Sequence, residues 1–309
     1  AALIKAQIGS DTEQLSRSDT QRTRYTHLVA MHPGEPAVKR PFFLVAGMFG
    51  NVLNLRHLAH LIGSDRPFYG LQARGLYGDH QPHETFEDMA RDYLAEVRSV
   101  QPHGPYLFGG FSGGGITALE MAQQLRADGE EVALLVFLDT PLPKSPPLSS
   151  VDKATIQLQR LMRGGPAYVT RWAQNRVRWE LERFREKRDG APAEESSSAS
   201  FHSKTIETAF RRSLERYELA HYPGQVHLFR PKLDEAHRLP GNRVASSARE
   251  LIWPDNGWTP HVDGLQVFEV PGDHDSMVLE PNVRVMAARL RRCFAKVEEE
   301  LGQAAPSFV

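Results

Sequence analysis

Cysteine is scarce in this chain, because Cys293 is the only one among 309 residues. One cysteine cannot form an intramolecular disulfide, which excludes disulfide-stapled scaffolds and favours a reducing, cytoplasmic setting. Zinc-binding patterns and the H-E-x-x-H helix signature are missing too. The glycine-rich stretch at 109–115 lacks the lysine of a phosphate-binding loop, so we expect neither a metal nor a cofactor of the protein's own.

Charge imbalance and long apolar runs are also absent. Lys and Arg number 37 against 38 Asp and Glu, which gives a formal net charge of -1 and no electrostatic footprint for nucleic acid. No apolar run approaches the ~20 residues that span a bilayer. The first residues contain no apolar signal-peptide block. We therefore expect no nucleic-acid partner and no membrane span.

Composition divides the chain into a core, an insertion and two ends. Residues 1–24 are polar and are predicted to form a flexible linker. The core is predicted to cover 25–144 and 223–302, and residues 303–309 a tail. Proline-rich and charged sequence at 145–222 interrupts the pattern and predicts a helical lid, inserted into one domain rather than forming a second.

Short apolar runs alternate with helical patterns along the core. Continuous apolar runs of this kind are typical of strands buried on both faces. Their alternation with helices predicts an α/β fold with a mostly parallel, doubly wound sheet, whose ligands bind beyond the carboxyl ends of the strands. The predicted strands lie at 28–30, 42–46, 67–71, 106–108, 132–138, 226–229 and 265–270, and a terminal helix is predicted over 282–301.

A G-F-S-G-G stretch at 110–114 joins one of these strands to the next helix. In this context G-x-S-x-G predicts a nucleophile elbow, because the sharp turn lifts the serine hydroxyl above the sheet edge. Small flanking residues let such a turn close without a Cβ clash. Backbone N–H groups at the helix N-terminus can stabilise a developing oxyanion. We therefore predict Ser112 as the catalytic nucleophile of an α/β-hydrolase fold.

A serine nucleophile needs a base, and the base needs a carboxylate that orients it. In α/β-hydrolases the three residues follow in the order Ser, Asp, His. Asp139 ends the strand after the elbow helix, and His274, one of 13 histidines, sits in the loop after the last predicted strand. Both are therefore expected at the same sheet edge as Ser112. Asp273 and Asp275 are alternative partners for the histidine.

The oxyanion hole of this fold combines two backbone N–H groups. The first is expected from Gly113, directly after the nucleophile. The second is expected from the G-M-F-G-N loop at 47–51, which follows the first core strand, and Met48 is the predicted donor. A tight turn without a catalytic part is the alternative for this loop.

Several further motifs accompany the elbow. They are R-P-F-Y-G-L-Q-A-R-G-L at 66–76, Q-P-H-G-P-Y at 101–106, A-L-E-M-A at 118–122, L-D-T-P at 138–141, P-G-D-H at 271–274 and L-E-P-N-V at 279–283. With these motifs the chain resembles the C-terminal type I thioesterase domains of polyketide synthases and nonribosomal peptide synthetases. The resemblance covers about residues 25–145 and 223–300. The loop at 47–51 departs from it, because many members carry His-Pro before the oxyanion donor.

The resemblance implies a serine thioesterase that acts on a substrate held by the phosphopantetheine arm of an upstream carrier protein. Ser112 would accept the acyl chain, His274 would be the general base and Asp139 its partner. Met48 and Gly113 match the oxyanion positions. Water would release a free acid, and an internal hydroxyl or amine would release a macrocycle. Alternatives are a free-standing serine carboxylesterase or lipase, and a non-catalytic binding module of the same fold.

The predicted lid carries two further patterns. Tyr168, Trp172 and Trp179 share one helix face, which suits either the roof of an acyl channel or ordinary packing. Basic residues outnumber acidic ones between Arg160 and Arg188. This excess suits either docking of an acidic carrier protein or a solvated helix face.

Overall fold

The computed structural model describes residues 26–32, 34, 39–78, 80–144, 148–163, 204–233, 236–241, 243–245 and 253–304. The predicted linker at 1–24 and most of the predicted lid lie outside the described residues. Tyr168, Trp172, Trp179 and the basic stretch beyond residue 163 also lie outside them.

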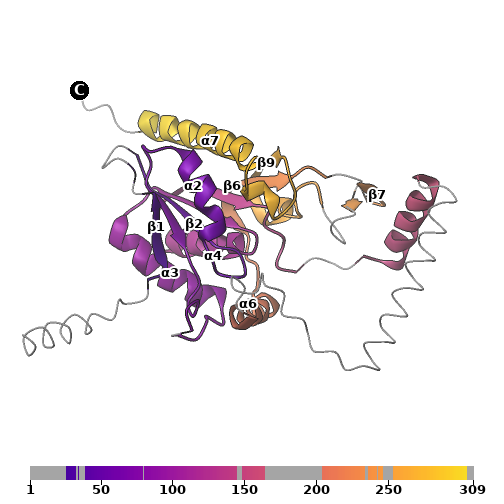
Figure 1. Ribbon diagram of the computed structural model, residues 1–309, viewed down its shortest axis with the longest axis horizontal. Helices are drawn as coiled ribbons and strands as arrows, with labels where there is room; N and C mark the ends of the chain where they lie inside the picture. The colour runs from indigo at the N-terminus through magenta and orange to yellow at the C-terminus, as the bar shows by residue number, and fades with distance from the viewer. Residues whose placement is uncertain are drawn as a thin grey trace, which may run out of the picture.

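A seven-stranded sheet forms the centre of the domain (Figure 1). The strand order is β1-β3-β2-β4-β5-β6-β9, and within it β1 pairs antiparallel with β3 while the other pairs are parallel. The predicted α/β fold with a mostly parallel sheet is therefore confirmed. The strands are β1 (Leu28–His32), β2 (Phe42–Val45), β3 (Phe68–Leu71), β4 (Tyr106–Phe111), β5 (Val132–Leu138), β6 (Tyr222–Pro231) and β9 (Val262–Val270).

Helices cover both faces of this sheet (Figure 1). Strand β2 illustrates the reason, because successive side chains of a strand point to opposite faces. Phe42 and Leu44 pack in the core beneath helices α2 (Arg56–Ile62) and α7 (Val283–Ala304). Phe43 and Val45 pack in the other core, beneath α3 (Phe86–Val100) and α4 (Gly114–Ala127). Because β2 contributes side chains to the cores on both faces of the sheet, its sequence is an apolar run without alternation.

Helix α3 begins with a side-chain cap. Thr85 has extended backbone geometry, and its Oγ1 accepts a hydrogen bond of 3.1 Å from the N–H of Asp88. This bond satisfies one of the amide donors that a helix start leaves without an intrahelical acceptor. Helix α4 ends at Asp128, and the following Gly129 has a φ of 81°, which suits the left-handed turn after a helix.

The described parts of the predicted lid are helical. Residues 150–163 form a helix, and α6 (Lys204–Arg216) precedes β6. Helix α6 packs Phe210 against Phe86 of α3 and Ile116 of α4. Two short strands, β7 (His237–Leu239) and β8 (Arg243–Ala245), form an antiparallel pair between β6 and β9 that the sequence patterns did not predict.

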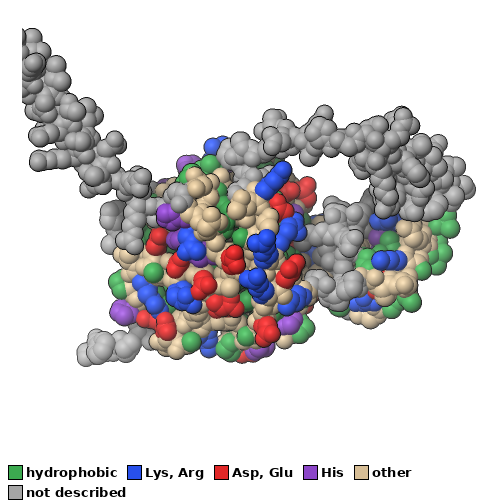
Figure 2. Space-filling model, turned by 90° about the horizontal axis from the view of Figure 1, so that it is seen from below, with side chains coloured by type: hydrophobic (Ala, Val, Ile, Leu, Met, Phe, Trp, Pro, Cys, Tyr) green, Lys and Arg blue, Asp and Glu red, His purple; other side chains and the backbone are tan. Residues whose placement is uncertain are grey.

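Charged side chains of both signs are mixed over the surface seen in Figure 2. Several are joined in ion pairs, such as Arg98 with Asp128 at 2.5 Å and Arg211 with Glu207 at 2.8 Å. This mixture agrees with a formal net charge of -1. Within the described residues, the helices are too short or too polar to cross a membrane.

Candidate active site

Ser112 occupies the sharp turn between β4 and α4. Its φ is 52°, a left-handed conformation that costs a non-glycine residue on the order of 1–2 kcal/mol. The backbone packs closely against both sides of the turn, which can close because Gly110 and Gly114 have no Cβ. A Cβ at Gly110 would lie 2.2 Å from the backbone of Gly114, and one at Gly114 would lie 2.2 Å from the carbonyl oxygen of Ala46. Both glycines of the motif are therefore required by the packing of the turn.

The side chains of Ser112, His274 and Asp139 form a continuous hydrogen-bonded chain. Nε2 of His274 lies 2.9 Å from Oγ of Ser112, and Nδ1 lies 2.7 Å from Oδ2 of Asp139. The three residues follow the carboxyl ends of β4, β9 and β5. Parallel strands bring these ends to one edge of the sheet, and there the three predicted residues meet.

The neighbouring acidic residue makes different contacts. Asp273 Oδ1 accepts a hydrogen bond of 2.8 Å from the N–H of Ser276 and one of 2.7 Å from its hydroxyl. These bonds lower the pKa of the Asp273 carboxyl and tie it to the start of the short helix η4 (Ser276–Val278). Of the carboxylates proposed to partner His274, Asp139 is the one in contact with the ring.

Asp139 is almost completely buried, with 2% of its surface exposed, and has a φ of 50°. Its N–H donates to the carbonyl of Phe229 on β6 over 2.7 Å. Its second carboxylate oxygen, Oδ1, accepts a bond of 3.0 Å from Nδ2 of Asn256. Nδ2 also reaches the carbonyl oxygen of Thr140 at 3.2 Å. A buried carboxylate thus has a hydrogen-bond donor at each oxygen, as its desolvation requires.

Asn256 is a site residue that the sequence analysis missed. Its φ of 51° places it in the left-handed region, which asparagine adopts more readily than most residues. An N-G pair at 256–257 is a turn signal in the sequence. That signal predicts the turn but not the partner, since Asn256 and Asp139 are far apart along the chain.

The imidazole of His274 is held on its face as well as at its nitrogens. The ring stacks on Phe111, with centroids 5.3 Å apart and planes tilted by 22°. Its side chain is 31% exposed, whereas that of Asp139 is 3% exposed. The His274 ring is therefore oriented by buried groups, yet its side chain is partly exposed beside Ser112.

Met48 and Gly113 lie at the two backbone segments from which an oxyanion hole would be built. Met48 sits in the turn after β2, closed by a 2.8 Å bond from Gly50 N–H to Gly47 O. Gly113 immediately precedes α4. Val45 of β2 pairs with Gly110 of β4, which sets the two segments side by side. In the described part of the chain, neither Met48 N–H nor Gly113 N–H donates to a backbone carbonyl.

Helix α6 brings part of the predicted lid to the elbow. A Cβ at Gly113 would lie 2.3 Å from the ring of Phe210, so the phenylalanine covers the backbone beside the nucleophile. Phe210 also packs edge-on against Phe86, with ring centroids 5.1 Å apart. The amphipathic pattern of α6 does not reveal this contact, because it shows that a face is buried without showing what buries it.

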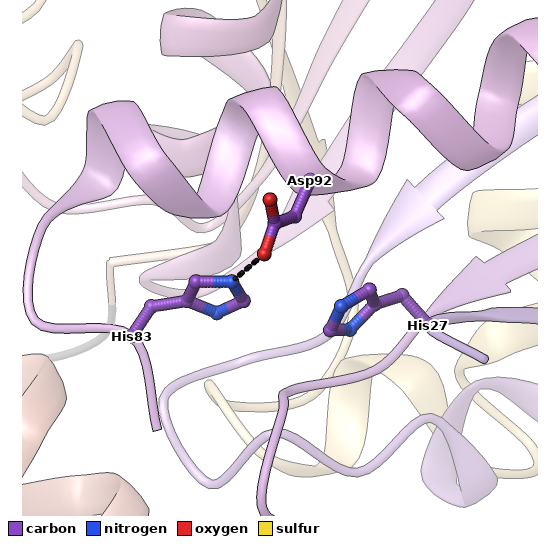
Figure 3. A group of neighbouring side chains, drawn as sticks. All are labelled: His27, His83 and Asp92. Carbon is purple, nitrogen blue, oxygen red and sulfur yellow. Dashed lines mark hydrogen bonds and ion pairs between the residues drawn. The ribbon is translucent and has the colours of Figure 1, made fainter. Parts of the chain in front are cut away.

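A second histidine–carboxylate group is formed by His27, which precedes β1, and by His83 and Asp92, which lie before and within α3 (Figure 3). Nε2 of His83 lies 2.8 Å from Oδ2 of Asp92, and Nδ1 of His27 lies 3.1 Å from the carbonyl oxygen of Gln72. Burial lowers the pKa of both histidines. Their candidate ligand atoms are close enough for a metal. However, Nη1 of Arg74 lies 3.1 Å from the same Asp92 oxygen, and its charge opposes a cation there.

Comparison with known proteins gives concordant findings. The family model described as Thioesterase domain matches residues 40–285. The polyketide synthase PksR of Bacillus subtilis is 34% identical over 154 residues, which is 50% of this chain and 6% of that synthase. Indigoidine synthase of Dickeya dadantii is 36% identical over 154 residues, 50% of this chain and 10% of that protein. The chain therefore spans a small part of the length of these relatives.

Solved structures share the fold. A covalent complex of the NocB thioesterase domain with a fluorophosphonate nocardicin G analogue superposes with a TM-score of 0.58 and 24% identity, covering 86% of this chain and 98% of that one. The four-domain nonribosomal peptide synthetase AB3403 gives a TM-score of 0.60 and 21% identity, covering 91% of this chain and 21% of that one.

Proposed function

Because the chain belongs to the thioesterase domain family, we propose that it releases an acyl or peptidyl chain from a carrier-protein phosphopantetheine thioester through an acyl-enzyme on Ser112. The observation that carries this proposal is the 2.9 Å contact between Ser112 Oγ and His274 Nε2, with His274 Nδ1 held 2.7 Å from Asp139. The sequence relatives include a polyketide synthase and a dimodular nonribosomal peptide synthase, which supports the carrier-bound substrate.

Asp139 selects the tautomer of His274 that the first step needs. A carboxylate beside Nδ1 accepts its proton in a hydrogen bond, which leaves the lone pair of Nε2 facing Ser112. His274 then removes the hydroxyl proton while Oγ attacks the thioester carbonyl carbon. Burial of Asp139 keeps water from competing for the imidazole. The imidazolium that forms is stabilised by the same carboxylate.

The negative charge that develops on the carbonyl oxygen needs donors that are already in place. Met48 N–H and Gly113 N–H are proposed to supply them from the turn after β2 and the start of α4. The carbon–sulfur bond then breaks, and His274 passes its proton to the departing pantetheine sulfur. The products of this half-reaction are the free thiol of the arm and an ester on Ser112.

Release of the acyl chain uses the same groups in reverse. His274 takes a proton from a second nucleophile, which attacks the ester carbonyl, and then returns the proton to Ser112 Oγ. Water gives a free acid, and a hydroxyl or amine of the same chain gives a macrolactone or macrolactam. Partitioning between them depends on how the bound chain excludes water.

An upstream carrier protein is the partner proposed for this reaction, since the relatives are much longer than this chain. We place the reaction in the cytoplasm, where the buried thiol of Cys293 would remain reduced. A free-standing carboxylesterase or lipase would use the same three residues. A binding module would not need them.

Paired substrates separate these functions. Turnover is measured on an acyl-pantetheine thioester and on the matching oxoester, with the native protein and with Ser112→Ala. We expect thioester hydrolysis to exceed oxoester hydrolysis, and Ser112→Ala to lower kcat by at least about 10³-fold. A preference for the oxoester would favour the carboxylesterase. An absence of turnover on both, in a folded protein, would favour the binding module.

A further inference from the structure

A groove of 380 Å³ begins beside the catalytic histidine. Its floor includes Phe111, whose ring stacks on His274. One wall is the turn after β2 and the start of α2, and the other is Leu279, in the segment that follows His274. The groove is therefore joined to His274 through the Phe111 ring, although no residue of the triad lines it.

The walls of this groove are mainly apolar near the site and basic farther along. Phe49, Leu53 and Leu279 line it together with Phe111. Leu53 and Leu279 are 54% and 41% exposed, which is unusual for leucine unless something packs on it. The polar lining includes Arg56 and His57 at the start of α2.

Arg56 carries a charge that the described protein does not neutralise. The backbone N–H of Arg56 donates to Leu53, but its guanidinium has no hydrogen bond or ion pair among the described residues, and no acidic residue lines the groove. By contrast, Arg40 and Arg66, on the same side of the sheet, both contact Glu298 of α7. The sequence order alone gave no reason to single out Arg56.

We propose that this groove binds the acyl chain of the substrate, with an apolar segment between Leu53 and Leu279 and an anionic group, such as a carboxylate, at Arg56. The inference rests on the proposed function, because it takes Ser112 as the point of attachment. Its chemistry is charge complementarity at one end and burial of apolar surface along the walls. Arg56 would thus determine specificity without touching the reacting atoms.

The test uses two acyl N-acetylcysteamine thioesters of equal length, one ending in a carboxylate and one in a primary amide. These donors contain no phosphate, so the acyl chain carries the only difference in charge. We expect the native protein to prefer the carboxylate in kcat/KM, by about five- to tenfold. Arg56→Gln should remove the preference, and Arg56→Glu should reverse it.

Arg91→Glu is the matched control. Arg91 is an exposed arginine on α3, on the opposite face of the sheet from α2, where it pairs with Asp88. Its reversal makes the same change in net charge and should leave the carboxylate preference intact. Equal turnover of both donors by the native protein would overturn the proposal. So would a preference that Arg56→Glu leaves unchanged.

A second comparison identifies the source of the anion. The same neutral acyl group is offered on phosphopantetheine and on pantetheine. If Arg56→Gln lowers kcat/KM only for the phosphopantetheine donor, the groove binds the carrier arm, and the proposal that it binds the acyl chain is wrong. If Arg56→Gln lowers kcat/KM only for the donor with the carboxylate-terminated chain, the proposal that the groove binds the acyl chain stands.

A labelling experiment keeps the test independent of thioesterase activity. An alkyl fluorophosphonate forms an oxygen–phosphorus bond to Ser112 as fluoride leaves, so no turnover is needed. A carboxylate-terminated probe should label the native protein faster than its amide counterpart, and Arg56→Glu should reverse the order. This order would support the groove even if no thioester were hydrolysed. Equal rates for the two probes would contradict it.

Discussion

Two histidine–carboxylate pairs in this protein have nearly the same length and different surroundings. His274 lies 2.7 Å from Asp139, and His83 lies 2.8 Å from Asp92. In the first pair the carboxylate is buried and the imidazole is 31% exposed. In the second pair the imidazole is buried, at 1% exposed, and the carboxylate is 42% exposed. The burial pattern is therefore inverted.

The groups at the other end of each pair differ as well. Nε2 of His274 faces the hydroxyl of Ser112, whereas Nδ1 of His83 is buried without a hydrogen-bond partner among the described residues. Asp139 accepts a hydrogen bond from the neutral amide of Asn256, while Asp92 also forms an ion pair with Arg74. The comparison teaches that a short histidine–aspartate contact alone does not indicate catalysis. The proposed mechanism also requires an exposed base with a nucleophile at its free end.

Replacing each aspartate by asparagine should give the largest contrast. Asp139→Asn leaves the shape intact but removes the acceptor that fixes the Nδ1 proton, and we expect kcat to fall on the order of 10⁴-fold. Asp92→Asn should leave kcat within about twofold, because Asp92 contacts His83 and Arg74 rather than a residue of the triad. Steady-state kinetics on one acyl thioester measures both. Similar losses in both variants would remove the distinction between the two pairs.

Asn256→Ala tests the buried support of Asp139. Loss of one hydrogen bond to a charged group should lower kcat about tenfold and leave KM near its native value. Alanine is also strained at a φ of 51°, so Asn256→Gly serves as the companion variant without that strain. A glycine variant that folds normally and keeps full kcat would show that the amide has no positioning role.

The second pair should affect stability rather than activity. Burial holds the folded-state pKa of His83 below its ordinary value of 6.5, so the unfolded chain takes up the proton first as pH falls. The contribution of neutral His83 is complete above about pH 6.5 and is lost as pH drops below that value. As the pH falls through about 6.5, His83→Gln should reduce the slope of unfolding free energy against pH, by at most about 1.4 kcal/mol per pH unit.

Urea unfolding at several pH values measures that slope. Buried His27 also has a lowered pKa, so part of the slope should persist in His83→Gln. A slope identical to that of the native protein would contradict the stabilising role of neutral His83.

The sheet was predictable because its strands are short apolar runs with helices between them. The run at 42–46 packs into the cores on both faces of the sheet, so it is continuously apolar and can be recognised as a strand. Strands β7 and β8 were missed because three-residue strands in polar sequence carry no such pattern. The predicted start of β6 was late, since Tyr222 and Gln225 precede the apolar run and belong to the strand through pairing with β9.

The site was predictable where chain order and strand ends determine it. Ser112, Asp139 and His274 follow three parallel strands, and the structure places them within hydrogen-bond distance, though their catalytic roles stay predictions. Asn256 and Phe210 were missed for one physical reason. Each acts through a contact between distant segments, and neither periodicity nor a motif records which segment packs on which.

The most direct test of the account is the intact mass of the protein during turnover of an acyl-pantetheine thioester, with rapid quenching and peptide mapping. We predict a mass increase equal to the acyl group, located at Ser112 in the native protein and absent from Ser112→Ala. Consumption of the thioester by the native protein without any adduct, together with an active Ser112→Ala variant, would contradict the acyl-enzyme mechanism.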